Sequence, residues 1–401
     1  MSVIDWRELY AQNQAALAAA GVNLPATSAA LLPAAIVPSR RTTSPPPPQN
    51  WLRAGGTPLT PHRHQLATRP RVRSGPQAAD RVLVHVPPGL DASAPAAAVC
   101  MLHGCTQDPA TFAAATAMNE TADRHGFVVV YPGQPRTRNV QGCWNWFLPE
   151  HQQRGAGEPE HIAGIARRLL AQEFGQAIDP TRIFVAGLSS GGAMALVLAV
   201  CYPDLFAAAA IHSGLPYRSA HDVASAFAVM GRAGATRPPD GEKIRAAMGE
   251  HARPVPSVVI HGTADSTVAP ENARHILAQL MQANHLAAPQ TCAHDPARPT
   301  ASQQLSADGG LTYTHNRWVD AQGALMHESI GVHDLGHAWS GGLPGGSYTD
   351  PRGPSATEAI WAFFAQAARP PTPTAASAAD TRMTPEALPA QSSEQNTLQP
   401  A

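Results

Sequence analysis

The sequence lacks an excess of charge of either sign and lacks long apolar runs. It has 28 Lys and Arg against 29 Asp and Glu in 401 residues. The charge is therefore balanced, and it gives no indication that the partner is nucleic acid or an anionic membrane surface. A membrane-spanning helix needs about 18 or more consecutive apolar residues, and we expect no span because no run reaches that length. The hydrophobic fraction of 44% is close to that of globular proteins, so a sizeable core is available.

Cysteine is also scarce, and no CxxC pair occurs. The five cysteines are Cys100, Cys105, Cys143, Cys201 and Cys292. An odd number leaves at least one of them free within a monomer. The spacing is typical of buried, reduced side chains that pack as small apolar groups. A bridge between Cys105 and Cys143 is a second option, and the sequence alone leaves the choice open.

The N-terminus lacks the basic start and apolar stretch of a secretory signal. Asp5, Arg7 and Glu8 occupy positions where an apolar segment would stand. The simplest expectation is therefore a cytoplasmic protein.

Proline and glycine are abundant, at 39 and 32 residues, and the prolines cluster near the two ends. We expect a helical extension over residues 1–40, a Pro-rich linker over 41–78 and a disordered tail over 369–401. The helix expected at 3–20 either packs on the core or serves as an arm that binds a surface. The catalytic core is then expected at residues 79–368.

Within that core, short apolar runs alternate with helical patterns. Strands are expected at 81–86, 96–102, 127–133, 182–187, 206–214, 256–262, 313–319 and 324–330. Helices are expected at 109–125, 161–174, 191–202, 271–282 and 354–368. This alternation predicts an α/β fold with a mostly parallel central sheet and helices on both faces.

One turn between a strand and a helix carries a catalytic signature. The segment Gly187-Leu188-Ser189-Ser190-Gly191 follows an apolar run and precedes a helix of small residues. A Gly-x-Ser-x-Gly turn in this position is a nucleophile elbow, which presents its serine on a strained backbone. The glycines stand two residues before and after Ser189 because bulkier neighbours would clash. We therefore expect Ser189 to be a nucleophile.

A serine nucleophile needs a base, and the base needs an orienting acid. In this fold the chain order is Ser, then Asp or Glu, then His. Asp265 stands in the turn after the strand expected at 256–262. Two histidines, His333 and His337, follow the last expected strand, and we favour His337 because Gly336 leaves the backbone before it mobile.

The developing oxyanion requires backbone N–H groups aimed at it. One is expected from Ser190, the residue after the nucleophile, and the other from Cys105 in the loop after an early strand. His103 is expected to brace this loop. A role for the Cys105 thiol as a competing nucleophile is disfavoured because no partner base is evident.

Three tryptophans are candidates for substrate contacts. Trp144 and Trp146 lie in the segment CWNWF, and they fit a binding wall or a pair of core anchors equally well. Trp339 follows His337 by two residues, so we expect it to wall an apolar substrate pocket.

Together, the segments LHGCTQ, CWNWF, GLSSGGAMA, HGTADSTV and GHAWSGG resemble the poly(3-hydroxybutyrate) depolymerase family of esterases, relatives of feruloyl and acetylxylan esterases. The resemblance spans about residues 80–368. It implies an α/β-hydrolase domain that cleaves ester bonds without a metal or organic cofactor. The family's catalytic triad falls on Ser189, Asp265 and His337, and its oxyanion position falls on Cys105.

The resemblance implies degradation of a polyhydroxyalkanoate polyester or its oligomers, with association with a storage granule as a further expectation. One alternative is a carboxylesterase for small or carbohydrate-linked feruloyl or acetyl esters. Another is a granule-associated protein without catalysis. Many members of the family are extracellular, which is the alternative to the cytoplasmic location. The sequence does not indicate an oligomeric state.

Overall fold

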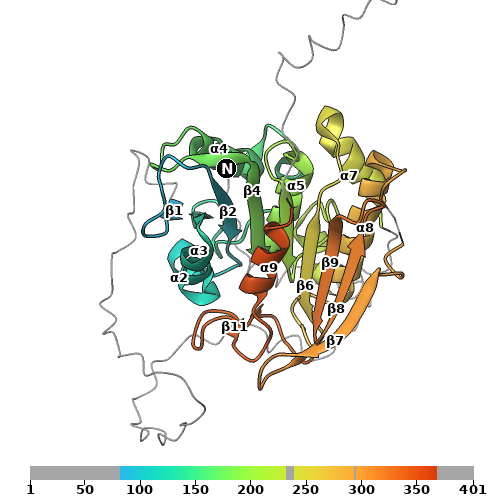
Figure 1. The fold of residues 1–401 in the computed structure, drawn as a ribbon. Coiled ribbons are helices and arrows are strands. Elements are labelled where there is room, and N and C mark those ends of the chain that lie inside the picture. Colours follow the sequence, from blue (N-terminus) through green and yellow to red (C-terminus); the bar gives the residue numbers. More distant parts are fainter. Residues whose placement is uncertain (1–81, 232–238, 293–294, 368–401) are drawn as a thin grey trace, which may run out of the picture.

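The computed structural model describes residues 82–231, 239–292 and 295–367. The expected N-terminal helix at 3–20, the linker at 41–78 and the tail at 369–401 lie outside these residues. The described part contains a nine-stranded sheet with the strand order β1-β3-β2-β4-β5-β6-β9-β8-β7 (Figure 1). The strands from β3 to β9 in this order run parallel, while β1, β8 and β7 pair antiparallel at the edges.

The strands are β1 (Val82–His85), β2 (Ala96–Leu102), β3 (Phe127–Pro132), β4 (Ile178–Leu188), β5 (Ala208–His212), β6 (Ser257–Gly262), β7 (Ala301–Ser306), β8 (Thr312–Val319), β9 (Leu325–Val332) and the separate two-residue pair β10 (Trp339–Ser340) and β11 (Thr349–Asp350). Every residue of β2, β3, β5 and β6 is buried. Such unbroken apolar runs are characteristic of parallel strands covered on both faces.

The helices are α2 (Pro109–Thr116), α3 (Met118–His125), α4 (Gly157–Leu170), α5 (Ser190–Cys201), α6 (Val223–Met230), α7 (Gly241–Met248), α8 (Glu271–Ala287) and α9 (Ala356–Phe364), with short 3-10 turns η2 (Pro149–His151) and η4 (Gly249–His251). Apolar residues of α4 to α8 form one core cluster with the sheet, and those of α2, α3 and α9 form a second. Successive residues of β2 alternate between the two clusters, which places the helices on opposite faces of the sheet.

This architecture confirms the predicted α/β-hydrolase fold, with a mostly parallel sheet covered on both faces. All the strands predicted in the core, and all its predicted helices but one, are present with shifted ends. Helix α4 begins and ends four residues earlier than expected. Strand β7 and the helices α6 and α7 were not predicted.

The prediction of one continuous helix over residues 109–125 is wrong. The segment forms two helices, α2 and α3, which are separated at Ala117. This residue has φ 56° and ψ 24°, the left-handed conformation that ends α2 before α3 begins. The carbonyls of Ala115 and Thr116 accept hydrogen bonds from Leu343 and Thr357. These two carbonyls therefore bind the segments that carry Leu343 and Thr357, and a second helix, α3, begins at Met118.

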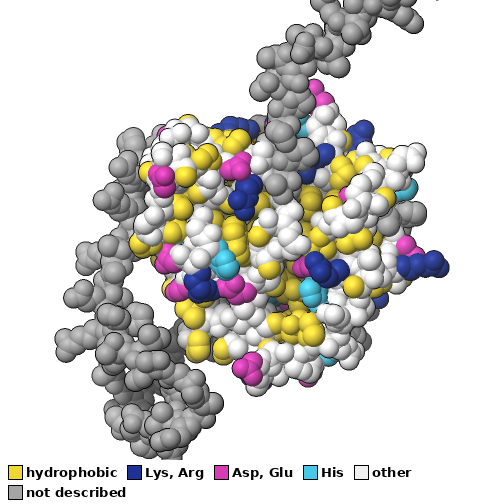
Figure 2. Space-filling model, in the orientation of Figure 1, with side chains coloured by type: hydrophobic (Ala, Val, Ile, Leu, Met, Phe, Trp, Pro, Cys, Tyr) yellow, Lys and Arg dark blue, Asp and Glu magenta, His cyan; other side chains and the backbone are white. Residues whose placement is uncertain are grey.

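Among the described residues, no helix is both long enough and apolar enough to cross a membrane. On the face shown in Figure 2, Lys and Arg side chains lie interspersed with Asp and Glu side chains. That face therefore has no continuous basic patch, in keeping with the near-zero net charge.

We predict that the C-terminal helix contributes strongly to stability through Phe364. Its ring is fully buried and stacks on Phe184 of β4, with the ring centroids 4.6 Å apart. Phe364→Ala should lower the free energy of unfolding by about 3–5 kcal/mol, because a large cavity would remain. Urea unfolding followed by circular dichroism measures this change. The exposed Leu286→Ala is the control and should change the free energy by less than about 0.5 kcal/mol; equal effects would contradict the assigned packing.

Candidate active site

Ser189 stands in a sharp turn between β4 and α5. Its φ of 58° and ψ of −120° fall in a region that residues with a side chain rarely adopt. A Cβ on Gly187 would lie 2.3 Å from the Gly191 carbonyl, and one on Gly191 would lie 2.1 Å from the Leu102 carbonyl oxygen. Both flanking positions therefore require glycine, and the segment has the geometry predicted for a nucleophile elbow.

Asp265 and His337 lie in hydrogen-bond contact, although 72 residues separate them in the chain. The His337 Nδ1–H donates to Asp265 Oδ2 over 2.7 Å. Asp265 Oδ1 accepts the backbone N–H groups of Thr267 and Val268 at 2.9 and 2.8 Å. Burial alone would raise the Asp265 pKa, but hydrogen bonds from His261 and His337 outweigh it and hold this pKa well below its usual range. The carboxylate is thus ionised and can orient the His337 ring.

Backbone contacts hold the three loops together at the carboxyl edge of the sheet. The N–H of Ala264 donates to the Leu335 carbonyl over 3.0 Å, which joins the Asp265 turn to the loop that carries His337. His212 joins this second loop to the elbow. Its carbonyl accepts the Ser189 N–H at 2.9 Å, and its Nε2 accepts the Ser340 N–H at 3.1 Å. Burial, together with nearby histidines, lowers the His212 pKa to about 3, so the ring is a neutral acceptor.

Ser189 is 8% exposed. Among the described residues, its hydroxyl makes no hydrogen bond to the His337 ring. Catalytic hydrogen bonds are commonly long in a ligand-free enzyme and shorten when substrate binds. The structure thus brings the predicted acid and base into contact and places the predicted nucleophile, Ser189, in the adjoining loop, which His212 connects to the loop of His337.

Two backbone N–H groups are available beside Ser189. The Ser190 N–H lies in the first turn of α5, where N–H groups have no intrahelical acceptor. The Cys105 N–H donates to no other described residue. The preceding residue, Gly104, approaches the elbow closely, since a Cβ there would lie 3.6 Å from the Cβ of Ser189. These are the two donors expected to form the oxyanion hole.

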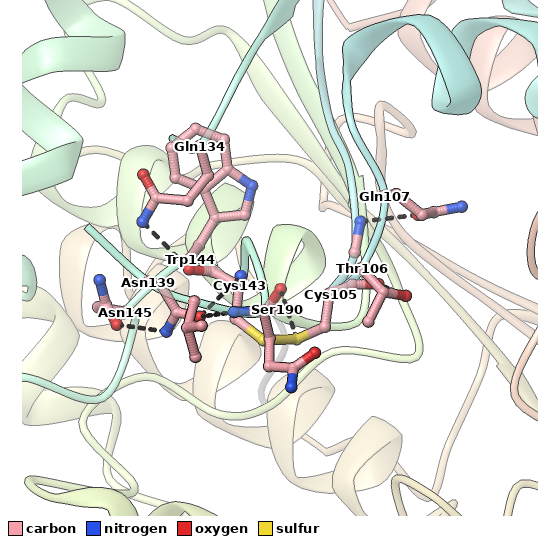
Figure 3. Close-up of a disulfide and its surroundings, with 12 residues drawn as sticks. Cys105, Thr106, Gln107, Gln134, Asn139, Cys143, Trp144, Asn145 and Ser190 are labelled. Carbon is pink, nitrogen blue, oxygen red and sulfur yellow. Dashed lines mark hydrogen bonds between the residues drawn. A yellow bond between two sulfur atoms is a disulfide. The ribbon is translucent and has the colours of Figure 1, made fainter. Parts of the chain in front are cut away.

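A disulfide joins Cys105 to Cys143 and settles the question that the sequence left open (Figure 3). The Ser190 hydroxyl lies 3.5 Å from the Cys105 sulfur. The bridge thus packs against the start of α5 and ties the Cys105 loop to the CWNWF segment. Cys100, Cys201 and Cys292 are free and buried, in line with their expected role as small core residues.

A buried carboxylate holds the other end of the bridge. Glu158 is 1% exposed, and its two oxygens accept the side-chain and backbone N–H groups of Asn145 at 2.7 and 2.8 Å. The Gln134 side chain donates to the same carboxylate. Asn145 accepts from Asn139 at 2.9 Å, and Asn139 accepts the Cys143 N–H at 3.2 Å. Figure 3 shows the part of this chain that runs from Asn145 through Asn139 to Cys143. Through Glu158, the whole chain fixes the Cys143 segment relative to α4.

The three tryptophans are buried beside the site loops instead of lining an open surface. Trp144 and Trp146 are 0% and 5% exposed, and Trp144 donates to the His103 carbonyl over 3.1 Å. Trp339 is 0% exposed, stacks on His212 and donates to Thr357 over 3.0 Å. This burial favours the core-anchor alternative for Trp144 and Trp146, and it argues against an open pocket wall at Trp339.

The remaining histidine candidates also have defined places. His333 contacts the Thr312 and Thr314 hydroxyls at 3.2 and 3.0 Å, which leaves His337 as the partner of Asp265. His103 is 1% exposed, contacts the Gly104 carbonyl and accepts the Gln134 N–H. This geometry agrees with a brace for the Cys105 loop, and burial lowers its pKa.

Sequence reasoning missed three residues at this site. Tyr348 is 45% exposed, and its ring lies edge-on to that of His337 with centroids 6.3 Å apart. His212 and His261 contact the elbow and Asp265 from neighbouring strand ends. The available signal was position, because both histidines stand at the carboxyl ends of buried parallel strands, where sites of open α/β sheets gather.

The fold and this arrangement define an α/β-hydrolase with a serine elbow and an Asp-His pair. The esterase PHB depolymerase family matches residues 82–297, and the chain belongs to that family.

Curated relatives include three esterases of different named substrates. Poly(3-hydroxyalkanoate) depolymerase C of Paucimonas lemoignei is 36% identical over 262 residues, which cover 63% of this chain and 57% of that protein. Feruloyl esterase B of Neurospora crassa is 35% identical over 147 residues, covering 36% and 48%. A probable acetylxylan esterase A of Aspergillus fumigatus is 29% identical over 182 residues, covering 43% and 47%. The chain thus spans about half the length of the curated relatives it matches.

A solved structure confirms the fold. The acetyl xylan esterase from Aspergillus awamori superposes with a TM-score of 0.53 and 20% identity over 72% of this chain and 94% of that one.

We predict that the disulfide supports catalysis by fixing the Cys105 N–H. Cys143→Ser breaks the bridge but keeps that N–H in the chain. Turnover (kcat) of a short-chain aryl ester should fall about tenfold or more, since complete loss of one oxyanion donor costs about 10²–10³ in kcat. Steady-state kinetics measure the change. Cys292→Ser is the matched control, because Cys292 is free and buried; an unchanged kcat in Cys143→Ser would refute the prediction.

Proposed function

We propose that this chain is a serine esterase that hydrolyses the ester bonds of a poly(3-hydroxyalkanoate) polyester or its oligomers. The observation that carries the proposal is the Asp265–His337 hydrogen bond of 2.7 Å at the sheet edge that also holds the strained Ser189. An ionised acid, an oriented imidazole and an elbow serine are the components of acyl transfer.

The proposed reaction proceeds in two steps. His337 Nε2 accepts the Ser189 hydroxyl proton as Oγ attacks the ester carbonyl, and the N–H groups of Cys105 and Ser190 stabilise the oxyanion. The imidazolium then donates its proton to the leaving alcohol as the C–O bond breaks and the acyl-enzyme forms. Water, deprotonated by His337, attacks the acyl carbon. The imidazolium then returns the proton to Ser189 Oγ as the acyl C–O bond breaks and the acid leaves. Asp265 maintains the Nδ1–H tautomer throughout.

The polyester is favoured over small esters by the relatives and by the rim of the site. The Paucimonas relative is named for poly(3-hydroxyalkanoate) and matches the longest stretch of this chain among those compared above. Leu343 and Tyr348, which are 39% and 45% exposed, lie in the loop that follows His337. The Tyr348 ring contacts that of His337, and an exposed aromatic side chain at this position suits an apolar polymer chain.

A carboxylesterase for feruloyl or acetyl esters is the second candidate function. It rests on the 35% identity to feruloyl esterase B and on the shared fold of the acetyl xylan esterase. The chemistry at Ser189 would be the same, and only the acyl and alcohol groups would differ. The non-catalytic, granule-associated alternative has less support, because a strained elbow beside an Asp265 carboxylate bonded to His337 is not needed in a purely structural protein.

The compartment is part of the proposal. Disulfides persist in oxidising compartments and are rare in the cytosol. The Cys105–Cys143 bridge therefore supports the extracellular alternative over the cytoplasmic location that the N-terminal sequence suggested. Association with a granule is likewise a proposal, which a binding experiment would test.

The test is incubation of the purified chain with amorphous poly(3-hydroxybutyrate) granules. We expect soluble 3-hydroxybutyrate and its oligomers, measured by mass spectrometry, from the wild type and a loss of at least about 10³-fold in Ser189→Ala, since the nucleophile is essential. Ser302→Ala, on the exposed strand β7, is the matched control and should retain full release.

The same proteins are assayed on short-chain aryl, feruloyl and acetylated-xylan esters. Cleavage of these esters without release from granules would move the assignment to the second candidate. Equal release by Ser189→Ala and the wild type would refute the serine mechanism, and no turnover of any ester would favour the non-catalytic alternative.

A further inference from the structure

His261 lies at the end of β6, next to the acid of the proposed triad, and has no role in the mechanism above. Its side chain is 3% exposed. Its Nε2 lies 2.9 Å from the Val268 carbonyl oxygen and 3.3 Å from Asp265 Oδ2. Both neighbours are acceptors, so Nε2 must carry a proton that is shared between them.

The opposite side of the ring makes no such contact. The His261 Nδ1 atom is buried and has no hydrogen-bond partner among the described residues. The ring also borders a cavity of about 340 Å³ between the start of α8 and the strands β6, β9 and β8. Among the described residues, the polar contacts of this ring are therefore all made by Nε2, with the Asp265 turn.

The Asp265 carboxylate receives donors from several directions. Oδ1 accepts from the Thr267 and Val268 N–H groups, and Oδ2 accepts from His337 at 2.7 Å. The His261 N–H approaches this same Oδ2. A carboxylate held at both oxygens cannot rotate without breaking a hydrogen bond, so its lone pair stays directed at the His337 ring.

We propose that His261 is a positioning residue for Asp265: its Nε2–H clamps Oδ2 and the Val268 carbonyl so that the carboxylate keeps the orientation that His337 requires. This inference rests on the proposed esterase function and adds to it a residue that does not touch the substrate. His261 acts through Asp265, and its loss should slow the chemical step more than it weakens substrate binding.

The first test compares three substitutions at this position in the full chain. His261→Leu removes the donor, His261→Gln carries an N–H at about the reach of Nε2, and His261→Asn carries one that is too short. On a short-chain aryl ester, kcat should fall about tenfold in the Leu and Asn variants with KM nearly unchanged, because a small misorientation of a catalytic group is costly. His261→Gln should recover most of this loss.

A second readout separates positioning from general stability. The proton in the His337–Asp265 hydrogen bond gives a far-downfield NMR resonance, which should be sharp in the wild type and His261→Gln and shifted or broadened in the Asn variant. Thermal unfolding of each variant monitors the fold. Should His261→Leu fail to fold, the comparison of Gln with Asn still decides the point, since both are polar and both lack the ring.

Equal kcat values in the Gln and Asn variants, or an unchanged downfield proton in Asn, would overturn the proposal. A wild type that turns over no ester would instead reject the proposed function. In that case the NMR comparison alone still reports whether His261 orients Asp265.

Discussion

The sharp turn at Ser189 is the constraint on which the rest of the site depends. A positive φ at a residue with a side chain is unfavourable and persists only where surrounding contacts enforce it. Here, glycines at 187 and 191 allow backbone contacts that any Cβ would block. The Ser189 N–H is in turn held by the His212 carbonyl. The buried strand β4 and helix α5 thus impose a conformation that projects the hydroxyl from the sheet edge.

The other groups reach the same edge because of the parallel sheet. The turns after β6 and β9 place Asp265 and His337 side by side, and the Cys105 sulfur of the disulfide contacts Ser190 at the start of α5. A buried polar group supports each loop: Glu158 binds Asn145 in the segment that carries Cys143, His212 binds Ser340, and His261 lies beside Asp265. Rigid support of this kind lets an enzyme hold its reacting groups in place without substrate.

The sequence was sufficient to predict those parts of the site that depend on contiguous residues or on the order of loops in the sheet. The strand, the Gly-x-Ser-x-Gly turn and the helix are contiguous, and the order of loops in a parallel sheet placed Asp265 near His337. It was insufficient where residues distant in the sequence meet. The contact between Tyr348 and His337 has no local pattern, and neither does the pairing of Cys105 with Cys143. Strand β7 escaped prediction because its short, fully exposed segment, ASQQLS, lacks apolar alternation. The tryptophan rings were ambiguous because indoles serve equally as surface contacts and core anchors.

The central claim is that Ser189 is an activated nucleophile. Labelling with a fluorophosphonate, followed by proteolysis and mass spectrometry of the modified peptide, tests it most directly, since only a serine beside a functioning base reacts readily. The account predicts one adduct, on Ser189, that disappears when His337 is replaced by Ala. An adduct on a different serine, or no adduct on folded protein, would contradict it.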